Sequence, residues 1–315
     1  MNIYTKFAVT LTLLLTFGKT TLAADINFSA KEAYPEGIAY LSKDDAFLVS
    51  SIRKGTIGKV TKSGKYQPFI NDEKLISSLG LLLDEKRNNL WVVICDLGLS
   101  THSSEATKTK LAAVAMYDAT TGKRKAYYDL SNLIKGMHLA NDLTMDSDGN
   151  VYVTDSFSPA IYKIDTKGNS TIFASSELFK GEGVNLNGIT YHPDGYLLTI
   201  KYNSGELFRV DIKNPKKISK IQLNETIKGG DGLILTSNNQ LFVVQNQGND
   251  SVIELISTDG WRKAEIKSKK KTSQSFPTTG IKVKNSIFVL NGRLDSLLDE
   301  KAQKVNNFSI QEFKQ

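Results

Sequence analysis

Six related segments recur along this chain at similar spacing, and this repetition limits its fold more than any other feature of the sequence. In most copies a polar residue or glycine opens a short apolar strand, and a turn with Asp, Asn or Gly leads into a second apolar strand. The clearest copy is NDLTMDSDGNVYVTDS at Asn141–Ser156. The second residues of the six copies serve as markers, and they are Gly37, Gly80, Asp142, Gly188, Gly232 and Gly280. Successive markers lie 43, 62, 46, 44 and 48 residues apart, which indicates similar units with one insertion.

Most units continue with a third and a fourth strand, as in AIYKIDT followed by STIFAS. Helical periodicity of useful length is nearly absent. The repeats therefore predict an all-β fold, a six-bladed β-propeller of four-stranded antiparallel blades, as a single domain over residues 25–315. An open ring would expose unpaired strand edges, so we expect residues 25–30 and the segment NFSIQEF at 307–313 to complete one blade together.

Residues 1–24 are predicted to be a secretory signal peptide. Lys6 precedes the apolar run Phe7–Phe17, and small residues follow at Ala23 and Ala24. The run is too short for a stop-transfer helix, so we expect cleavage near Ala23 or Ala24 and a secreted or periplasmic protein. The alternative is an uncleaved anchor. No other long apolar stretch occurs, which predicts no membrane span in the mature chain.

Composition and motifs exclude several classes of function. The formal net charge is +7, and the densest basic run, at Lys267–Lys271, lacks interleaved aromatic residues, so we expect no nucleic-acid partner. Cys95 is the only cysteine, which rules out an internal disulfide. The absence of GxSxG, P-loop, dinucleotide and HExxH motifs disfavours serine hydrolases, kinases, NAD enzymes and zinc proteases. Nothing in the sequence predicts a partner protein.

The extra residues of the second unit form the Ser/Thr-rich segment GLSTHSSEATKTK at about 98–110. It has no apolar periodicity, so we expect an exposed loop. The sequence fits both a surface loop without a role at the site and a lid over the central channel.

The residue that opens each repeat is where the copies differ most in chemical type. The six are Glu36, Leu79, Asn141, Asn187, Asp231 and Thr279. The innermost strands of a propeller run side by side round a central channel, so equivalent positions converge on one axis. Two carboxylates and two carboxamides would form an all-oxygen set that suits a hard divalent cation. Alternatively, these residues merely make the turn into each strand.

These segments resemble the gluconolactonase and regucalcin (senescence marker protein) family of six-bladed propellers, with paraoxonases and drug-responsive lactonases as more distant relatives. The resemblance covers nearly the whole mature chain. It rests on PEGIAY at Pro35–Tyr40, NDLTMDSDGNVYVTD at Asn141–Asp155, NGITYHPDG at Asn187–Gly195 and DGL at Asp231–Leu233.

The resemblance implies a divalent cation held by Glu36, Asn187 and Asp231, with Asn141 as a substrate contact or further ligand. Ca²⁺ is favoured, and Mg²⁺, Mn²⁺ or Zn²⁺ are alternatives. The resemblance also implies hydrolysis of a small-molecule lactone or ester, with Asp231 as the candidate base and Asp142 as the reserve. The alternative is a non-catalytic propeller that binds a small ligand or a protein and uses the cation structurally.

The chain also departs from this family. Sugar-lactone members often carry an arginine two residues before the Asn of the Asn-Asp pair, where this chain has Leu139, and Leu143 replaces a frequent glycine. A more hydrophobic lactone or ester is therefore expected. His192 belongs to a turn, while His138 is a secondary candidate for substrate contact. The sequence does not decide whether His138 or His102 reaches the site.

Overall fold

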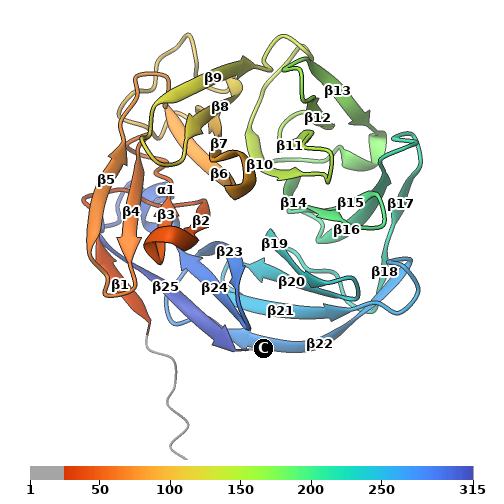
Figure 1. The fold of residues 1–315 in the computed structure, drawn as a ribbon. Helices are drawn as coiled ribbons and strands as arrows, with labels where there is room; N and C mark the ends of the chain where they lie inside the picture. The colour runs from red at the N-terminus through yellow and green to blue at the C-terminus, as the bar shows by residue number, and fades with distance from the viewer. Residues whose placement is uncertain (1–24, 315) are drawn as a thin grey trace, which may run out of the picture.

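In the computed structural model, which describes residues 25–314, six β-sheets surround a central axis (Figure 1). The first four blades are antiparallel sheets whose strands follow one another in sequence order. The first contains β2 (Ile38–Leu41), β3 (Ala46–Val49), β4 (Ile57–Thr61) and β5 (Tyr66–Ile70). The second contains β6 (Ser77–Asp84), β7 (Asn89–Cys95), β8 (Ala112–Asp118) and β9 (Arg124–Asp129). The third contains β10 (Ala140–Met145), β11 (Val151–Asp155), β12 (Ala160–Ile164) and β13 (Ser170–Ser175). The fourth contains β14 (Leu186–His192), β15 (Tyr196–Lys201), β16 (Glu206–Asp211) and β17 (Ile218–Lys220).

The fifth blade carries one strand that the repeats do not predict. Its antiparallel strands are β19 (Gly230–Ser237), β20 (Gln240–Gln245), β21 (Ser251–Ile256) and β22 (Lys263–Lys271). The additional strand β18 (Gln222–Leu223) pairs in parallel with β22 at the outer edge. The described chain also contains 3-10 turns at η1 (Ser42–Asp44), η2 (Glu85–Arg87) and η3 (Glu177–Phe179), and one short helix, α1 (Asp295–Leu298).

The sixth blade joins the two ends of the chain. It consists of β23 (Pro277–Val283), β24 (Ser286–Asn291), β25 (Asn307–Lys314) and, as its outermost strand, β1 (Ile26–Ser29). Phe28 pairs with Phe308 in the antiparallel register, and their ring centroids lie 5.9 Å apart. The six-bladed fold and its closure by terminal strands are therefore confirmed. The predicted signal peptide lies outside the described residues.

The core lies between adjacent blades, because the second strand of each blade is covered on both faces. Every residue of β3, β11 and β15 is buried, whereas no residue of β9 is buried and most of β22 is exposed. Apolar, β-branched and aromatic residues dominate these inner positions, which suits strands packed on both faces. Within residues 25–314 no helix has the length and hydropathy needed to cross a membrane.

The insertion of the second blade lies between β7 and β8 and is largely exposed, as expected. It is nevertheless organised by a buried carboxylate. Asp96 accepts hydrogen bonds from the Gly98 N–H at 2.7 Å, from Ser103 Oγ at 2.6 Å and from Thr107 Oγ1 at 2.7 Å. These bonds fix the start of the loop against the propeller, next to the central cavity described below.

Candidate functional site

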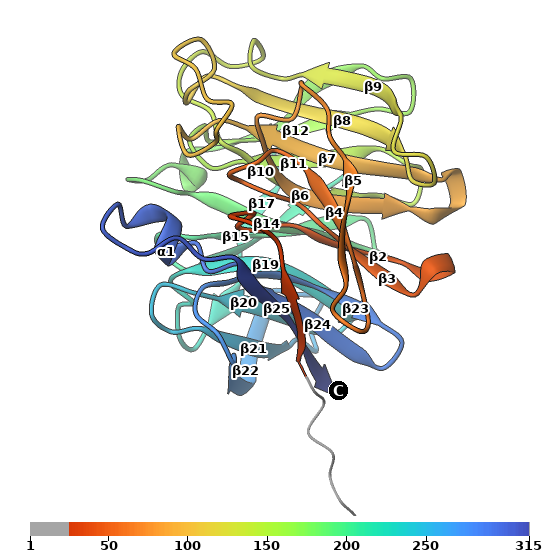
Figure 2. The ribbon, with the colours of Figure 1, turned by 90° about the vertical axis from the view of Figure 1, so that its left-hand side faces the viewer.

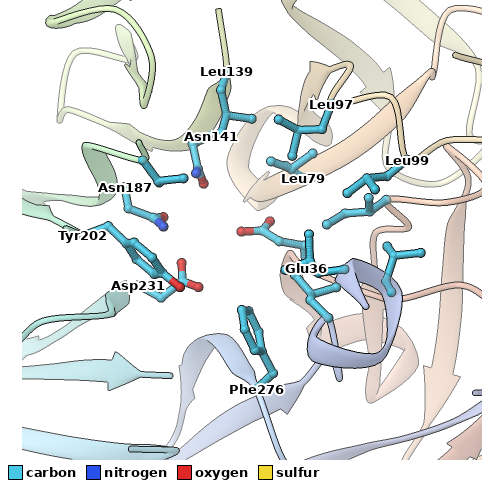
Figure 3. A pocket seen from close by; sticks show the side chains of 15 residues that line it. Glu36, Leu79, Leu97, Leu99, Leu139, Asn141, Asn187, Tyr202, Asp231 and Phe276 are labelled. Carbon is cyan, nitrogen blue, oxygen red and sulfur yellow. The ribbon is translucent and has the colours of Figure 1, made fainter. Parts of the chain in front are cut away.

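Four polar side chains from four blades meet on the propeller axis. Figure 3 shows the carboxylates of Glu36 and Asp231 and the carboxamides of Asn141 and Asn187 pointing toward a common centre. Glu36 precedes β2, whereas each of the other three is the second residue of an innermost strand, β10, β14 or β19. All four are buried and line the same cavity. The structure thus brings together the four residues that the repeats predicted to converge.

A repeated irregularity turns three of these side chains toward the axis. The pairing of the first and second strands shifts register between Ala140 and Leu143, between Leu186 and Ile189, and between Gly230 and Leu233. Each shift spans the position of the polar residue and its successor. A β-bulge of this kind bends the strand and redirects a side chain out of the regular alternation, so the same backbone feature presents an oxygen donor in three blades.

Three oxygen atoms in this cluster are buried and have no hydrogen-bond partner within the described chain: Glu36 Oε2, Asn141 Oδ1 and Asn187 Oδ1. Asn141 Nδ2 donates to Ser156 Oγ at 2.9 Å, which leaves the Oδ1 atom for the cavity. Buried acceptors without donors are destabilising, at about 1–3 kcal/mol each, and native proteins rarely keep them without a reason. A cation would satisfy all three, because each is a hard oxygen ligand.

Burial, together with neighbouring negative charge, raises the pKa values of the two carboxyl groups of the cluster. Burial, with the negative charges of Asp231 and Asp142, raises the pKa of Glu36 well above its usual range. Burial and Asp142 likewise raise the pKa of Asp231, although the Asn246 amide opposes this by donating to Asp231 Oδ2 at 2.7 Å. Since three carboxyl groups share one channel, the site favours a bound positive charge or protons.

Asp142 occupies a different part of the channel from the four-residue cluster. It lines a second cavity of about 260 Å³ among the innermost strands and does not line the cavity of the cluster. Burial raises its pKa to about 6, while the N–H groups of Leu143 and Ile189 act in the opposite direction. The reserve base Asp142 therefore lines a different cavity from the four-residue cluster.

The donor chemistry of the cluster fits a divalent cation that takes oxygen ligands. The described residues contain no group of three or more His, Cys, Asp and Glu side chains arranged to hold a metal. The predicted set is not of that kind, because only Glu36 and Asp231 are carboxylates and the other two donors are carboxamides. Two carboxylates with two neutral oxygens match the mixed ligand sets of Ca²⁺.

An apolar wall surrounds the cluster and encloses a cavity of about 140 Å³. We call these ten residues the apolar collar: Ile52, Leu79, Leu97, Leu99, Leu139, Val184, Phe276, Leu294, Leu297 and Leu298. The remaining lining residue, Tyr202, donates its hydroxyl to Asn246 Oδ1 at 2.6 Å. The collar residues lie between positions 52 and 184 and between positions 276 and 298. They include Leu99 of the insertion (Figure 3) and Leu297 and Leu298 of α1.

None of the three histidines lines this cavity. His138 is buried, with Nδ1 2.7 Å from Asp155 Oδ2 and Nε2 3.1 Å from the Ile134 oxygen. His102 is exposed in the insertion, and His192 Nε2 lies 2.8 Å from the Asn238 oxygen. His138 is therefore held by groups outside the cavity, and its role as a substrate contact gains no support from this geometry.

Two residues that orient the cluster were not predicted from the sequence. Ser156 fixes Asn141, and Asn246 fixes Asp231. Both residues directly follow the second strand of their own blade, β11 and β20. A polar residue directly after an apolar strand is therefore the sequence feature that could have predicted them. The collar residues Phe276 and Leu294 lie in connecting segments that no repeat covers, so the sequence carried no comparable signal for them.

Comparison with known proteins supports the fold. No protein-family model and no curated protein matches the chain significantly. Among solved structures, the major allergen Mala s 1 of Malassezia sympodialis is 17% identical over 93% of this chain and 96% of its own, with a TM-score of 0.73. A luciferin-regenerating enzyme is 13% identical over 91% and 95%, with a TM-score of 0.62. A gluconolactonase from Xanthomonas campestris is 13% identical over 92% and 89%, also at 0.62. The distant resemblance to gluconolactonase-like propellers is thus matched by their likeness in structure.

Proposed function

We propose that this protein is an exported, metal-dependent hydrolase that acts on lactones or esters. The observation that carries the proposal is the set of three buried, unpartnered oxygens that face one centre together with the Asp231 carboxylate. Structural neighbours that include gluconolactonases support a hydrolase of this kind. Export rests on the predicted signal peptide at residues 1–24.

Glu36, Asn187 and Asp231 would hold the cation, and Asn141 would serve as a fourth ligand or contact the substrate. We propose Ca²⁺, because it accepts mixed carboxylate and carboxamide oxygens in flexible geometry. When bound, a divalent cation would polarise the carbonyl of the substrate and offset the negative charge that develops on its oxygen.

Asp231 would accept the proton of the attacking water. A bound cation would oppose the rise in the pKa of Asp231 that burial causes, so the assignment rests on the position of this carboxylate at the common centre. The hydrogen bond from Asn246 to Oδ2 fixes the orientation of the carboxylate. Asp142 is the weaker candidate, because its oxygens accept the N–H groups of Leu143 and Ile189.

Hydrolysis of aldonolactones, aliphatic lactones and aryl esters by the mature protein tests this function. After chelation we expect turnover to disappear and to return with one of Ca²⁺, Mg²⁺, Mn²⁺ or Zn²⁺. Asp231→Asn should abolish hydrolysis and keep the fold, as judged by circular dichroism. Asp148→Asn, which neutralises an exposed turn residue, is the matched control and should stay active. Full activity of Asp231→Asn would refute the assignment of the base.

The second candidate function is a non-catalytic propeller that binds a ligand at the same cavity. It is favoured by the lack of any histidine, lysine or arginine among the cavity-lining residues. In that case Ca²⁺ would raise the melting temperature while every substrate of the panel stays intact.

A further inference from the structure

The fifth blade ends in an unusually long strand at the rim of the propeller. Its outermost antiparallel strand, β22, has nine residues and lies on the outside of the molecule (Figures 1 and 2). The outermost strands of the other five blades have between three and six residues. An exposed edge offers unpaired N–H and C=O groups to another strand, and short edge strands limit this exposure. β22 is the exception among the six blades.

The outer edge of β22 is covered only at its start. There β18 pairs with it in parallel, through Gln222 with Lys263 and Leu223 with Ala264. Within residues 25–314 no strand pairs with the outer side of β22 beyond Ala264. The fold therefore already places one short strand on this edge and leaves the rest of the edge open.

The regular part of the open edge is long enough for a short strand. The pairing of β22 with β21 shifts register at Lys267, and from Ser268 to Lys271 it is continuous over four residues. A strand of four residues is sufficient elsewhere in this molecule, because β1 pairs with β25 over four residues when it closes the sixth blade. The open edge thus has the length of an existing strand pairing.

The open edge carries an excess of positive charge. Beyond Ala264, β22 contains one glutamate, Glu265, and four lysines, and all five side chains are exposed. Lys271 Nζ donates to the Asn249 oxygen. Within the described chain the Nζ atoms of the other three lysines form no ion pair. These three are Lys267, Lys269 and Lys270.

The neighbouring strand β21 offers these lysines no free counter-charge. Lys269 stands opposite Ile253, and Lys270 stands opposite Val252. The one carboxylate of β21, Glu254, already accepts hydrogen bonds from Ser268 Oγ and from Gln240 Nε2, each at 2.8 Å. Successive side chains of a strand point to opposite faces of the sheet, so Lys269 and Lys270 present positive charge on both faces.

The charge decides which kind of strand fits this edge. A second copy of β22 would set lysines against lysines, and like charges on neighbouring strands are destabilising. An acidic strand would pair its backbone with the edge and its carboxylates with the lysines, as in the addition of a peptide strand to a sheet. We propose that the outer edge of β22 binds an extended acidic segment of a partner protein beside Ser268–Lys271. No residue of β22 lines the central cavity, so this inference is independent of the proposed function.

Two peptides of equal charge test whether strand pairing is involved. The probes are fluorescein-labelled Glu-Val-Glu-Val-Glu-Val and its counterpart with proline at each valine, titrated into the mature protein and followed by anisotropy. Proline lacks the N–H group and is excluded from regular strands, but it leaves the carboxylates in place. We expect the valine peptide to bind at least about tenfold more tightly than the proline peptide. It should also slow amide hydrogen exchange in residues 265–271.

A variant of the edge tests the lysines. It combines Lys267→Gln, Lys269→Gln and Lys270→Gln, and it should weaken binding of the valine peptide about tenfold, as expected for the loss of three exposed opposite-charge pairs. The control variant removes the same charge from the exposed turn between β16 and β17, by Lys213→Gln, Lys216→Gln and Lys217→Gln. The control should change the affinity by less than about twofold.

Several outcomes would overturn the inference. Equal affinity for the two peptides would mean attraction by charge alone, and equal losses in the two variants would mean attraction by the net charge of the protein. A valine peptide that binds more weakly than about 1 mM would exclude an acidic strand as the occupant. Dimerisation of the wild type that the edge variant abolishes would assign the edge to a second copy of the chain. Removal of metal ions by a chelator should leave the peptide affinity unchanged.

Discussion

Gly188 lies so close to Asp231 that a Cβ atom on residue 188 would stand 2.2 Å from the backbone oxygen of Asp231. The same relation recurs between Gly37 and the backbone oxygen of Leu79, also at 2.2 Å. Glycine is therefore required at these two marker positions by the close approach of neighbouring innermost strands. The residues before these glycines are Glu36 and Asn187, and the close approach of the strands brings both to the centre of the cluster. The glycines therefore help to position the polar cluster.

Gly188→Ala should destabilise the protein by about 1–3 kcal/mol or more, because the added methyl group has to displace backbone rather than a flexible side chain. It should also weaken Ca²⁺ binding by shifting Asp231. Urea denaturation and calorimetric titration measure the two effects. Gly183→Ala is the control, because nothing lies within 4 Å of a Cβ there and only its φ of +68° adds strain. Similar stability of Gly188→Ala and wild type would contradict the steric explanation.

The sequence predicted most of the fold because each blade must supply a strand pair that is apolar on both faces. Such apolar strand pairs can be recognised in the sequence, and six of them at the spacing of propeller blades are compatible with few other folds. Closure by residues 25–30 and 307–313 followed from the cost of exposed edges. The two-residue strand β18 was not predicted, because so short a segment has no periodicity and its pairing with β22 depends on tertiary placement.

The position of the cluster could be predicted because equivalent residues of different blades face the same axis. The orientation of single side chains could not. His138 lies near Asn141 in sequence, yet its ring is held by Asp155 at the end of β11. Of the two leucines that predicted a more apolar pocket, Leu139 lines the cavity of the cluster, whereas Leu143 lines the second cavity with Asp142. The rest of the apolar collar was not predicted, since Phe276 and Leu297 come from segments between strands whose path depends on the assembled propeller.

Ser156→Ala should lower Ca²⁺ affinity about tenfold, in line with the usual effect of removing a group that orients a metal ligand. Within the described chain Asn141 Nδ2 donates one hydrogen bond to a side chain, and Ser156 Oγ accepts it. Without this bond Asn141 would be free to turn its Oδ1 away from the centre. Calorimetric titration measures the affinity. Ser158→Ala is the control, because Ser158 is buried in the same blade but donates to the Met137 oxygen instead. Unchanged affinity in Ser156→Ala would argue against Asn141 as a ligand.

Phe28→Ala should destabilise the propeller by about 3–5 kcal/mol, which is typical of a buried aromatic truncated to alanine. Phe28 is 3% exposed and packs on Phe308 and Tyr66, so it joins the first strand to the closing strand and to the neighbouring blade. Denaturant midpoints measure the loss. Met137→Ala, at a side chain that is 62% exposed, should change stability by less than about 0.5 kcal/mol. Equal behaviour of the two variants would show that the closure contributes little.

His138 should make the protein less stable as the pH rises above neutrality. Its hydrogen bond to the Asp155 carboxylate raises its pKa in the folded state, against about 6.5 in the unfolded chain. The folded state therefore holds this proton more tightly, so its contribution is complete below about pH 6.5 and is lost as the pH rises through the folded-state pKa.

Free energies of unfolding between pH 5.5 and 9 should fall more steeply for wild type than for His138→Gln, whatever the absolute stability of the variant. The neighbours of the ring include Tyr162, whose hydroxyl lies 3.3 Å from Nδ1, and the Ile134 oxygen at Nε2, and neither supplies a competing cation. His102→Gln is the matched control, because His102 is exposed in the insertion and forms no ion pair within residues 25–314. Parallel pH profiles for wild type and His138→Gln would mean that His138 stays neutral in its buried site.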